Sequence, residues 1–164
     1  MKHTIAILLQ NESGALTRVS SMFSTRGFNI DSLSVAPTKD PMISRLTLVT
    51  DVSDEQMDQA VKQLYKLIDV IDVLDITPLD HIESELIMVK LKISDDNLNP
   101  IKTIFFDYSA EVINDKDDLT IIQMLAEPER INDFLKSIEG MSDLIAIARS
   151  GPLSLVKGDI SLSL

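Results

Sequence analysis

The sequence contains no cysteine, and this absence excludes several kinds of chemistry. Disulfides, thiolate metal sites and a cysteine nucleophile all need the thiol group. Only two histidines are present, His3 and His81, which leave little for a histidine metal cluster or a Ser/His/Asp triad. The missing cysteines also agree with a reducing compartment, and the N-terminus lacks the features of a signal peptide. We therefore expect a cytoplasmic protein without a metal site.

Long apolar runs are also missing. The longest stretch without a charged side chain, His3 to Asn11, has nine residues, whereas a membrane-spanning helix needs roughly 18. Hydrophobic residues nevertheless make up 45% of the 164-residue chain, and the mean hydropathy is +0.13. That composition is sufficient for a buried core. We expect a soluble protein with no membrane partner, built as one ordinary domain or two small ones.

Glycine and basic residues are scarce where nucleotide binding would need them. Gly14 and Gly27 are the only glycines before Gly140, so neither a G-x-G-x-x-G loop nor a P-loop can be formed. The net charge is −11 and aromatic residues amount to 4%, whereas nucleic-acid surfaces combine clustered lysine and arginine with stacking aromatics. The sequence thus excludes nucleic acid as a partner and the common kinds of nucleotide chemistry.

Regular apolar patterns divide the first half into strands and helices. Gly27 follows the first helical stripe and can end that helix in a left-handed cap. Ser53 and Gln56 form a capping box before the second stripe. The expected strands cover residues 4–9, 29–36, 42–50 and 70–76, and the expected helices cover residues 15–23 and 57–68.

The second half repeats the same order of elements. Asn99 is placed to cap a helix with Pro100 at its first position. The expected strands cover residues 85–93, 110–113, 119–125 and 144–148, and the expected helices cover residues 101–108 and 128–138. Because random misreadings would not agree twice, the repeat is a stronger signal than any single element.

The repeated order predicts an α+β fold made of two ferredoxin-like βαββαβ domains. The connection between the two halves lies near residues 78–84, so we expect an N-terminal domain at 1–78 and a C-terminal domain at 79–164. Residues 151–164, mostly serine and leucine, form a short tail to which no element is assigned.

Acidic clusters are the first candidates for catalytic chemistry, and each has a simpler explanation. The acidic turn at 115–118 resembles the start of a calcium loop, but Thr120 and Ala126 stand where the glycine and the final carboxylate belong. We therefore expect a solvated hairpin turn there. His81 lies in the connection between the halves, where a single histidine is usually a surface residue.

Asp69, Asp72 and Asp75 recur every three residues around a β-rich run. Strand side chains alternate between faces, so the three carboxylates cannot all meet at one site without a bulge. An exposed acidic edge, which discourages unwanted strand pairing, is the expectation for these residues.

The turn from Asn11 to Leu16 is where backbone polar groups concentrate. It leads from a buried strand into a helix N-terminus, whose unpaired N–H groups favour a carboxylate or phosphate. Gly14 removes the Cβ that would keep a ligand away. We expect the amides of Asn11 and Asn29 to converge beside this turn. The alternative is a purely structural turn in which Ser13 caps the helix and Asn29 serves the same local structure.

The segments NESGAL (11–16), RGFNI (26–30), SVAPT (34–38) and QLYKL (63–67) closely resemble the regulatory small subunit of acetohydroxyacid synthase, also called acetolactate synthase. That family carries an ACT domain, and the likeness is nearly without gaps over residues 4–76. Residues 85–93 and ARSG (148–151) are similar to the same family. The resemblance implies that the first domain is an ACT domain and the second is ACT-like.

The resemblance also implies a function. The chain would not be catalytic itself, but would activate a catalytic large subunit that condenses pyruvate with pyruvate or 2-oxobutyrate in branched-chain amino-acid synthesis. Thiamine diphosphate, Mg²⁺ and FAD would lie on that partner, and this chain would hold no cofactor. A branched-chain amino acid, valine first, would exert feedback inhibition by binding where two ACT domains of a homodimer meet. The implied effector-binding residues are Asn11, Ser13, Gly14, Ala15, Leu16, Asn29 and Ile30.

Two other functional classes remain open from the residues alone. One is a free-standing tandem ACT sensor for an amino acid, without an enzyme partner. The other, a small ferredoxin-like enzyme, would need a pair of titratable groups with separated pKa values or a metal. Activation of a large subunit would separate the regulatory subunit from the free-standing sensor.

Overall fold

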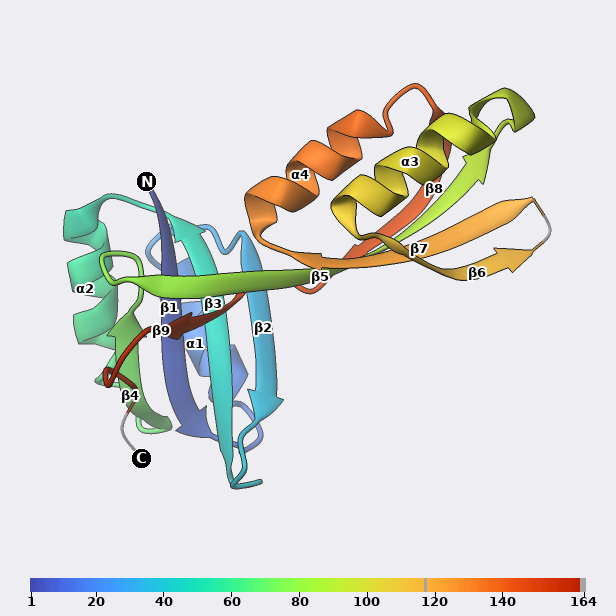
Figure 1. Ribbon diagram of the computed structural model, residues 1–164. Helices are drawn as coiled ribbons and strands as arrows, with labels where there is room; N and C mark the ends of the chain where they lie inside the picture. The colour runs from blue at the N-terminus through green and yellow to red at the C-terminus, as the bar shows by residue number, and fades with distance from the viewer. Residues whose placement is uncertain (117, 163–164) are drawn as a thin grey trace. The chain divides into compact units, whose positions relative to one another are not determined.

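The computed structural model describes residues 1–116 and 118–162 and divides the chain into two compact units (Figure 1). The first unit contains residues 1–82 together with 153–164, and the second contains residues 83–152. The boundary therefore lies at 82/83, four residues beyond the expected end of the first domain. The tail also belongs to the first unit, whereas the sequence placed it with the second.

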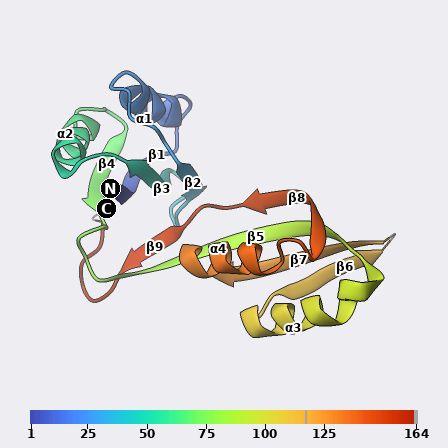
Figure 2. The same ribbon diagram turned by 90° about the horizontal axis from the view of Figure 1, so that it is seen from above.

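The first unit has the predicted βαββαβ order, with a four-stranded antiparallel sheet in the order β2-β3-β1-β4. Figure 2 shows both of its helices over one face of that sheet. The order follows from register, because β3 pairs along the whole of β1 and so separates β1 from β2. The elements are β1 (Lys2–Gln10), α1 (Ala15–Ser24), β2 (Ser32–Pro37), β3 (Ile43–Asp51), α2 (Asp54–Leu64) and β4 (Val70–Asp75).

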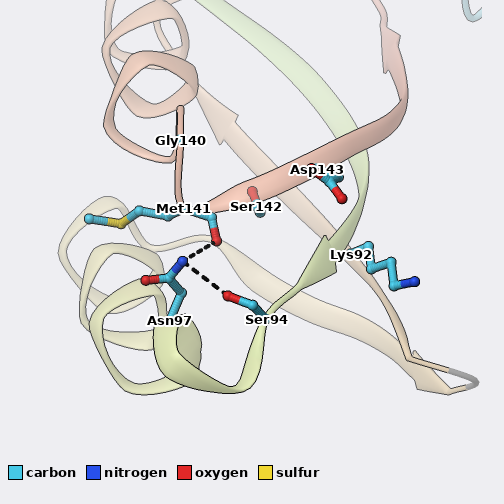
Figure 3. Close-up of a pocket in the computed structure, with 7 residues that line it drawn as sticks. All are labelled: Lys92, Ser94, Asn97, Gly140, Met141, Ser142 and Asp143. Atoms are coloured by element: carbon cyan, nitrogen blue, oxygen red, sulfur yellow. Dashed lines mark hydrogen bonds between the residues drawn. The ribbon is translucent and has the colours of Figure 1, made fainter.

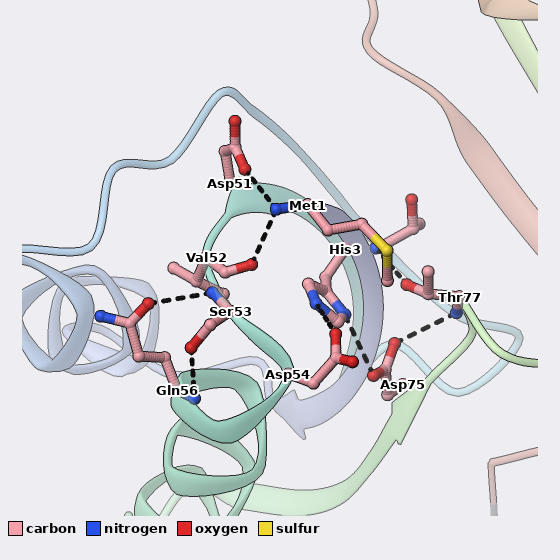
Figure 4. A network of polar contacts seen from close by, with 10 residues as sticks. Met1, His3, Asp51, Val52, Ser53, Asp54, Gln56, Asp75 and Thr77 are labelled. Atoms are coloured by element: carbon pink, nitrogen blue, oxygen red, sulfur yellow. Dashed lines mark hydrogen bonds and ion pairs between the residues drawn. The ribbon is translucent and has the colours of Figure 1, made fainter.

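Local sequence signals set the ends of both helices in this unit. Gly27 has φ +70°, its N–H donates to Ser24 O, and the N–H of Phe28 donates to Phe23 O, so the predicted glycine cap is confirmed as a Schellman motif. The capping box of Ser53 and Gln56 is confirmed as well (Figure 4).

The far end of α2 was predicted wrongly, because the helix stops at Leu64 instead of continuing to residue 68. Ile68, expected on its buried stripe, is 85% exposed. Leu67 still packs against the core from the turn that follows the helix. The helical spacing of apolar residues in the sequence therefore extends beyond the end of α2 and does not mark where the helix stops.

The core of the first unit lies between the sheet and its two helices. Its side chains come from alternate positions of the central strands and from the helical stripes, as the periodicity predicted. The largest fully buried members are Ile5, Ile7, Phe23, Leu46, Leu48, Met57 and Leu64.

The tail contributes a short strand, β9 (Leu153–Val156), where the sequence predicted no element. The Arg45 guanidinium on β3 donates through Nη2 to the Ser154 carbonyl at 2.8 Å, and burial lowers the pKa of Arg45. Lys157 pairs with Asp80 through both its backbone N–H and its ammonium group, whose Nζ lies 2.8 Å from Oδ1. These contacts hold the tail within the first unit.

The second unit repeats the topology, with the sheet order β6-β7-β5-β8 and two helices on one face (Figure 1). Its core contains Ile87, Val89, Leu91, Ile101, Phe105, Ile122, Met124, Ile131, Phe134 and Ile138. The elements are β5 (His81–Ile93), the short 3-10 turn η1 (Asp95–Asn97), α3 (Leu98–Tyr108), β6 (Glu111–Lys116), β7 (Leu119–Ala126), α4 (Pro128–Ser137) and β8 (Ser142–Arg149).

The start of α3 and the acidic stretch before β7 both differ from the predicted local structure. Asn99 is not the cap of α3, because the helix starts at Leu98 and Asn97 takes the cap position. The predicted acidic turn is shorter than expected, because β6 extends through Lys116 and pairs with β7 up to Leu119. Asp115 thus lies in the strand, where it accepts a hydrogen bond from the Thr120 hydroxyl. Asp117, part of the predicted turn, lies outside the described residues.

Candidate functional site

The turn between β1 and α1 presents free backbone donors. Gly14 occupies the cap position of α1 with φ +88°, and no side chain caps the helix there. Ser13 is therefore not the helix cap that the structural alternative required. The Ala15 N–H donates to Glu12 O at 3.2 Å, but within the described residues the N–H groups of Leu16 and Thr17 meet no protein acceptor. The first turn of α1 thus keeps the donors that a carboxylate needs.

Arg18 lies one helical turn after Gly14 and covers it. A Cβ on Gly14 would come within 3.1 Å of Arg18 Nη1. Positive φ and this close approach together explain why glycine stands at this position. The Arg18 side chain is 45% exposed, so the guanidinium forms part of the surface beside the turn.

Asp69 is the residue at this site that sequence reasoning missed. It was expected on an exposed acidic edge, but its side chain is 4% exposed and forms a two-point ion pair with Arg18. Its Oδ1 lies 2.9 Å from Arg18 Nη2, Oδ2 accepts from Nε, and its backbone carbonyl accepts the Gln10 N–H. Asp69 therefore ties the end of β1 and the first turn of α1 to the start of β4. β4 is an edge strand of the sheet, as expected for the run that follows Asp69, but Asp69 itself is not exposed there.

The ion pair shifts the pKa values of both partners. The hydrogen bonds from Arg18 lower the pKa of the Asp69 carboxyl, and those bonds raise the pKa of Arg18. A carboxyl whose pKa is lower in the folded state stabilises the fold above its unfolded pKa of about 3.9. That contribution is lost only in acid, as the pH falls through the lowered value.

Asn11 fixes the other side of the turn. Its backbone N–H donates to Met42 O and its side-chain amide donates to Pro41 O, both at 2.8 Å. The turn is thereby attached to the loop between β2 and β3. The Asn11 side chain remains exposed.

Asn29 does not converge with Asn11 within one chain, and that prediction was wrong. Its carbonyl accepts from the Thr50 hydroxyl and its amide donates to Asp31, whereas Asn11 contacts Met42. Thr50 and Met42 stand eight positions apart at opposite ends of β3, a separation of about 27 Å at 3.4 Å per residue. The reason is topological, because α1 runs back along β1 and delivers Asn29 to the far end of the sheet.

The remaining predicted residues lie around the same turn or near Asn29. Ala15 is buried against the core and Leu16 is 37% exposed beside it. Ile30 is partly buried and packs on the core near Asn29. The structure therefore groups Asn11, Ser13, Gly14, Ala15 and Leu16 at one end of the first unit and Asn29 and Ile30 at the other.

His3 is buried, and a metal site or an acid–base catalyst would need such a histidine. Its surroundings instead indicate a structural role (Figure 4). Its Nδ1 lies 3.3 Å from Asp75 Oδ2, and its Nε2 lies 3.2 Å from Asp54 Oδ1 without hydrogen-bond alignment. Within the described part of the chain, no group of three or more His, Asp or Glu side chains is placed to hold a metal ion. His3 thus links β1 to the start of α2 and the end of β4.

The polar residues of a pocket in the second unit also hold local structure together (Figure 3). The Asn97 amide nitrogen donates to Ser94 Oγ at 3.1 Å and to the Met141 carbonyl at 3.0 Å. Asn97 therefore joins the start of α3 to the loop before β8. The pocket is lined by Lys92, Ser94, Asn97, Gly140, Met141, Ser142 and Asp143.

The fold and the glycine turn together define an ACT-type protein with a second ferredoxin-like domain. Residues 5–72 match the family described as an AHAS small subunit-like ACT domain, and residues 84–158 match the family described as the small subunit of acetolactate synthase. The helices within the described residues are all too short or too polar to cross a membrane.

Whole-chain comparisons agree with both family matches. The chain is 37% identical over 160 residues to the acetolactate synthase isozyme 3 small subunit of Escherichia coli, covering 97% of this chain and 98% of that protein. It is 34% identical over 161 residues to the probable acetolactate synthase small subunit of Archaeoglobus fulgidus, covering 97% and 99%. The crystal structure of the small subunit from Thermotoga maritima superposes with a TM-score of 0.89 at 26% identity, covering 98% and 99%. The chain belongs to the family of acetolactate synthase small subunits, the regulatory and non-catalytic subunits of that enzyme.

Proposed function

We propose that this chain activates the catalytic large subunit of an acetolactate synthase in the cytoplasm and transmits feedback inhibition by valine. The observation that carries the effector site is the turn at Gly14, where N–H groups at the positive end of α1 meet no acceptor within the described residues. Family membership supports the large-subunit partner. We place thiamine diphosphate, Mg²⁺ and FAD on that partner.

The effector lies between two copies of the chain in this proposal. Asn11 and Asn29 stand at opposite ends of one unit, so they can act together only if two copies meet in antiparallel orientation across a two-fold axis. The N–H groups from Ser13 to Leu16, apart from that of Ala15, then hold the carboxylate, and the amides hold the ammonium and carboxylate groups. Leu16 and Ile30 supply the apolar wall for the side chain, and Ala15 supports the turn from the core beneath it.

An effector at such an interface couples binding to subunit packing. Valine that contacts both copies stabilises one dimer arrangement over others, and a shift in that equilibrium changes how the large subunit is held. This is the physical route from the turn at Gly14 to the activity of the partner.

Reconstitution tests the proposed function directly. We expect that adding the purified chain raises the acetolactate synthase activity of its large subunit, and that valine reverses the increase. Leucine and isoleucine, assayed in parallel, rank the effectors. Valine binding without any increase in activity would instead identify a free-standing sensor and contradict the enzyme partnership.

Mixed dimers test the shared site. Asn11→Ala and Asn29→Ala are each expected to weaken valine binding about ten- to hundredfold, because each removes a hydrogen bond to a charged group. When chains carrying one substitution each are combined, one of the two shared sites receives both substitutions and the other receives neither. Calorimetry should then find one site of wild-type affinity per mixed dimer.

The matched control is a dimer in which both chains carry both substitutions, which has no intact site. Sedimentation equilibrium on the wild type, with valine present, should show a dimer at micromolar concentration. A monomer, or mixed dimers with no high-affinity site, would contradict a site shared between copies.

A further inference from the structure

The Arg18 guanidinium has one edge occupied and one edge free. Asp69 accepts from Nε and from Nη2. Nη1 has no protein acceptor among the described residues, and it lies 3.1 Å from the position of a Cβ on Gly14. The free donor thus stands directly beside the turn at which, within the described residues, the N–H groups of Leu16 and Thr17 also meet no protein acceptor.

The residues around Arg18 fix the position of its guanidinium but do not use all of its N–H donors. Asp69 is buried, and its backbone carbonyl accepts the Gln10 N–H, so its carboxylate holds the Arg18 guanidinium in a fixed position. Glu12 adds a favourable charge interaction but forms no ion pair within 4 Å in the described structure. A planar guanidinium held in this way can offer its remaining N–H groups at a defined angle.

A zwitterion needs no basic residue to balance its charge, yet the fold places one here. We propose that Arg18 binds the carboxylate of the amino-acid effector through Nη1, together with the first-turn N–H groups of α1. This role deepens the proposed function and rests on it. Because Asp69 balances the charge of Arg18, the site selects a single carboxylate on a neutral zwitterion rather than a dianion.

A comparison of L-valine with L-valinamide isolates this contact, because the amide lacks the negative charge that Arg18 would bind. We expect Arg18→Gln in the full chain to weaken valine binding about ten- to hundredfold, the cost of losing a hydrogen bond to a charged group. Valinamide binding should change less than about threefold. The ratio of the valinamide to the valine dissociation constant, measured by calorimetry, should therefore fall at least about threefold.

Two further variants separate recognition from folding. Arg18→Gln leaves the buried Asp69 carboxylate unpaired, so Arg18→Gln with Asp69→Asn removes both charges and should show the same loss of discrimination with the fold retained. Lys62→Gln, at an exposed lysine on α2, is the matched control and should leave both ligands unaffected. Thermal midpoints without ligand report the folding of each variant.

The outcomes distinguish this inference from the function on which it rests. Equal weakening of valine and valinamide, or no weakening of either, would overturn the role of Arg18 and leave the effector site standing. A wild-type chain that binds no valine would overturn both. Loss of discrimination in the double variant with a normal thermal midpoint supports Arg18 as the carboxylate anchor.

Discussion

Replacing Gly14 by aspartate is expected to abolish valine binding and feedback inhibition while activation of the large subunit continues. The new Cβ would stand 3.1 Å from Arg18 Nη1, so the added carboxylate falls beside the guanidinium and over the first-turn N–H groups. It would occupy the place of the effector carboxylate and repel it. Calorimetry should show a loss of affinity of at least about a hundredfold.

Gly14→Ala is the matched control, because it adds the Cβ without the charge. The left-handed backbone at φ +88° disfavours any L side chain, at a cost of about 1 to 2 kcal/mol. Arg18 Nη1 is the end of a flexible side chain and can yield to the methyl group. We therefore expect lower stability and a loss of affinity below about tenfold. Unchanged valine affinity in Gly14→Asp would remove the effector from this turn.

The fold followed from local patterns, and so most of it could be predicted. The strands and helices of the two βαββαβ units are specified by the periodicity of their own residues, and that order then limits the possible sheets. β9 has no such pattern and was not predicted. Asn99 shows where local reading fails. Both Asn97 and Asn99 precede the helical stripe, and Asn97, which takes the cap position, is held by contacts with Ser94 and Met141. Met141 lies 44 residues away, beyond any local signal.

The candidate site was predicted less completely, because its parts come from distant segments. Asp69 looked like one of three similar aspartates, and only its position against Arg18, 51 residues earlier, makes it a buried ion-pair partner. Asn11 and Asn29 were expected to converge because one helix joins them. Because α1 runs back along β1, it instead delivers Asn29 to the opposite end of the sheet from Asn11, and no property of either residue indicates this.

Glu85 in the second unit is another buried acidic residue whose ion-pair partner lies far away in the sequence. Loss of this pair is expected to have a large effect on stability. It begins the run of inward-facing positions on β5, where an apolar residue would be usual, and its side chain is 3% exposed. Arg149 on β8 donates to it through Nη2 and Nε at 2.7 and 2.8 Å, and these bonds raise the pKa of Arg149. The pair closes the sheet between β5 and β8.

Arg149→Met should destabilise the second unit by about 2 to 3 kcal/mol while valine affinity stays within about twofold. Loss of one partner of a buried pair typically costs about 3 to 5 kcal/mol, and the 37% exposure of Arg149 places this pair below that range. Hydrogen exchange of the β5 and β8 amides in the full chain measures the change where it arises. Glu85→Leu with Arg149→Met removes both charges and should recover most of the stability. Unchanged exchange in the single variant, or an equal loss in the double variant, would show that the ion pair does not hold β8 to the sheet.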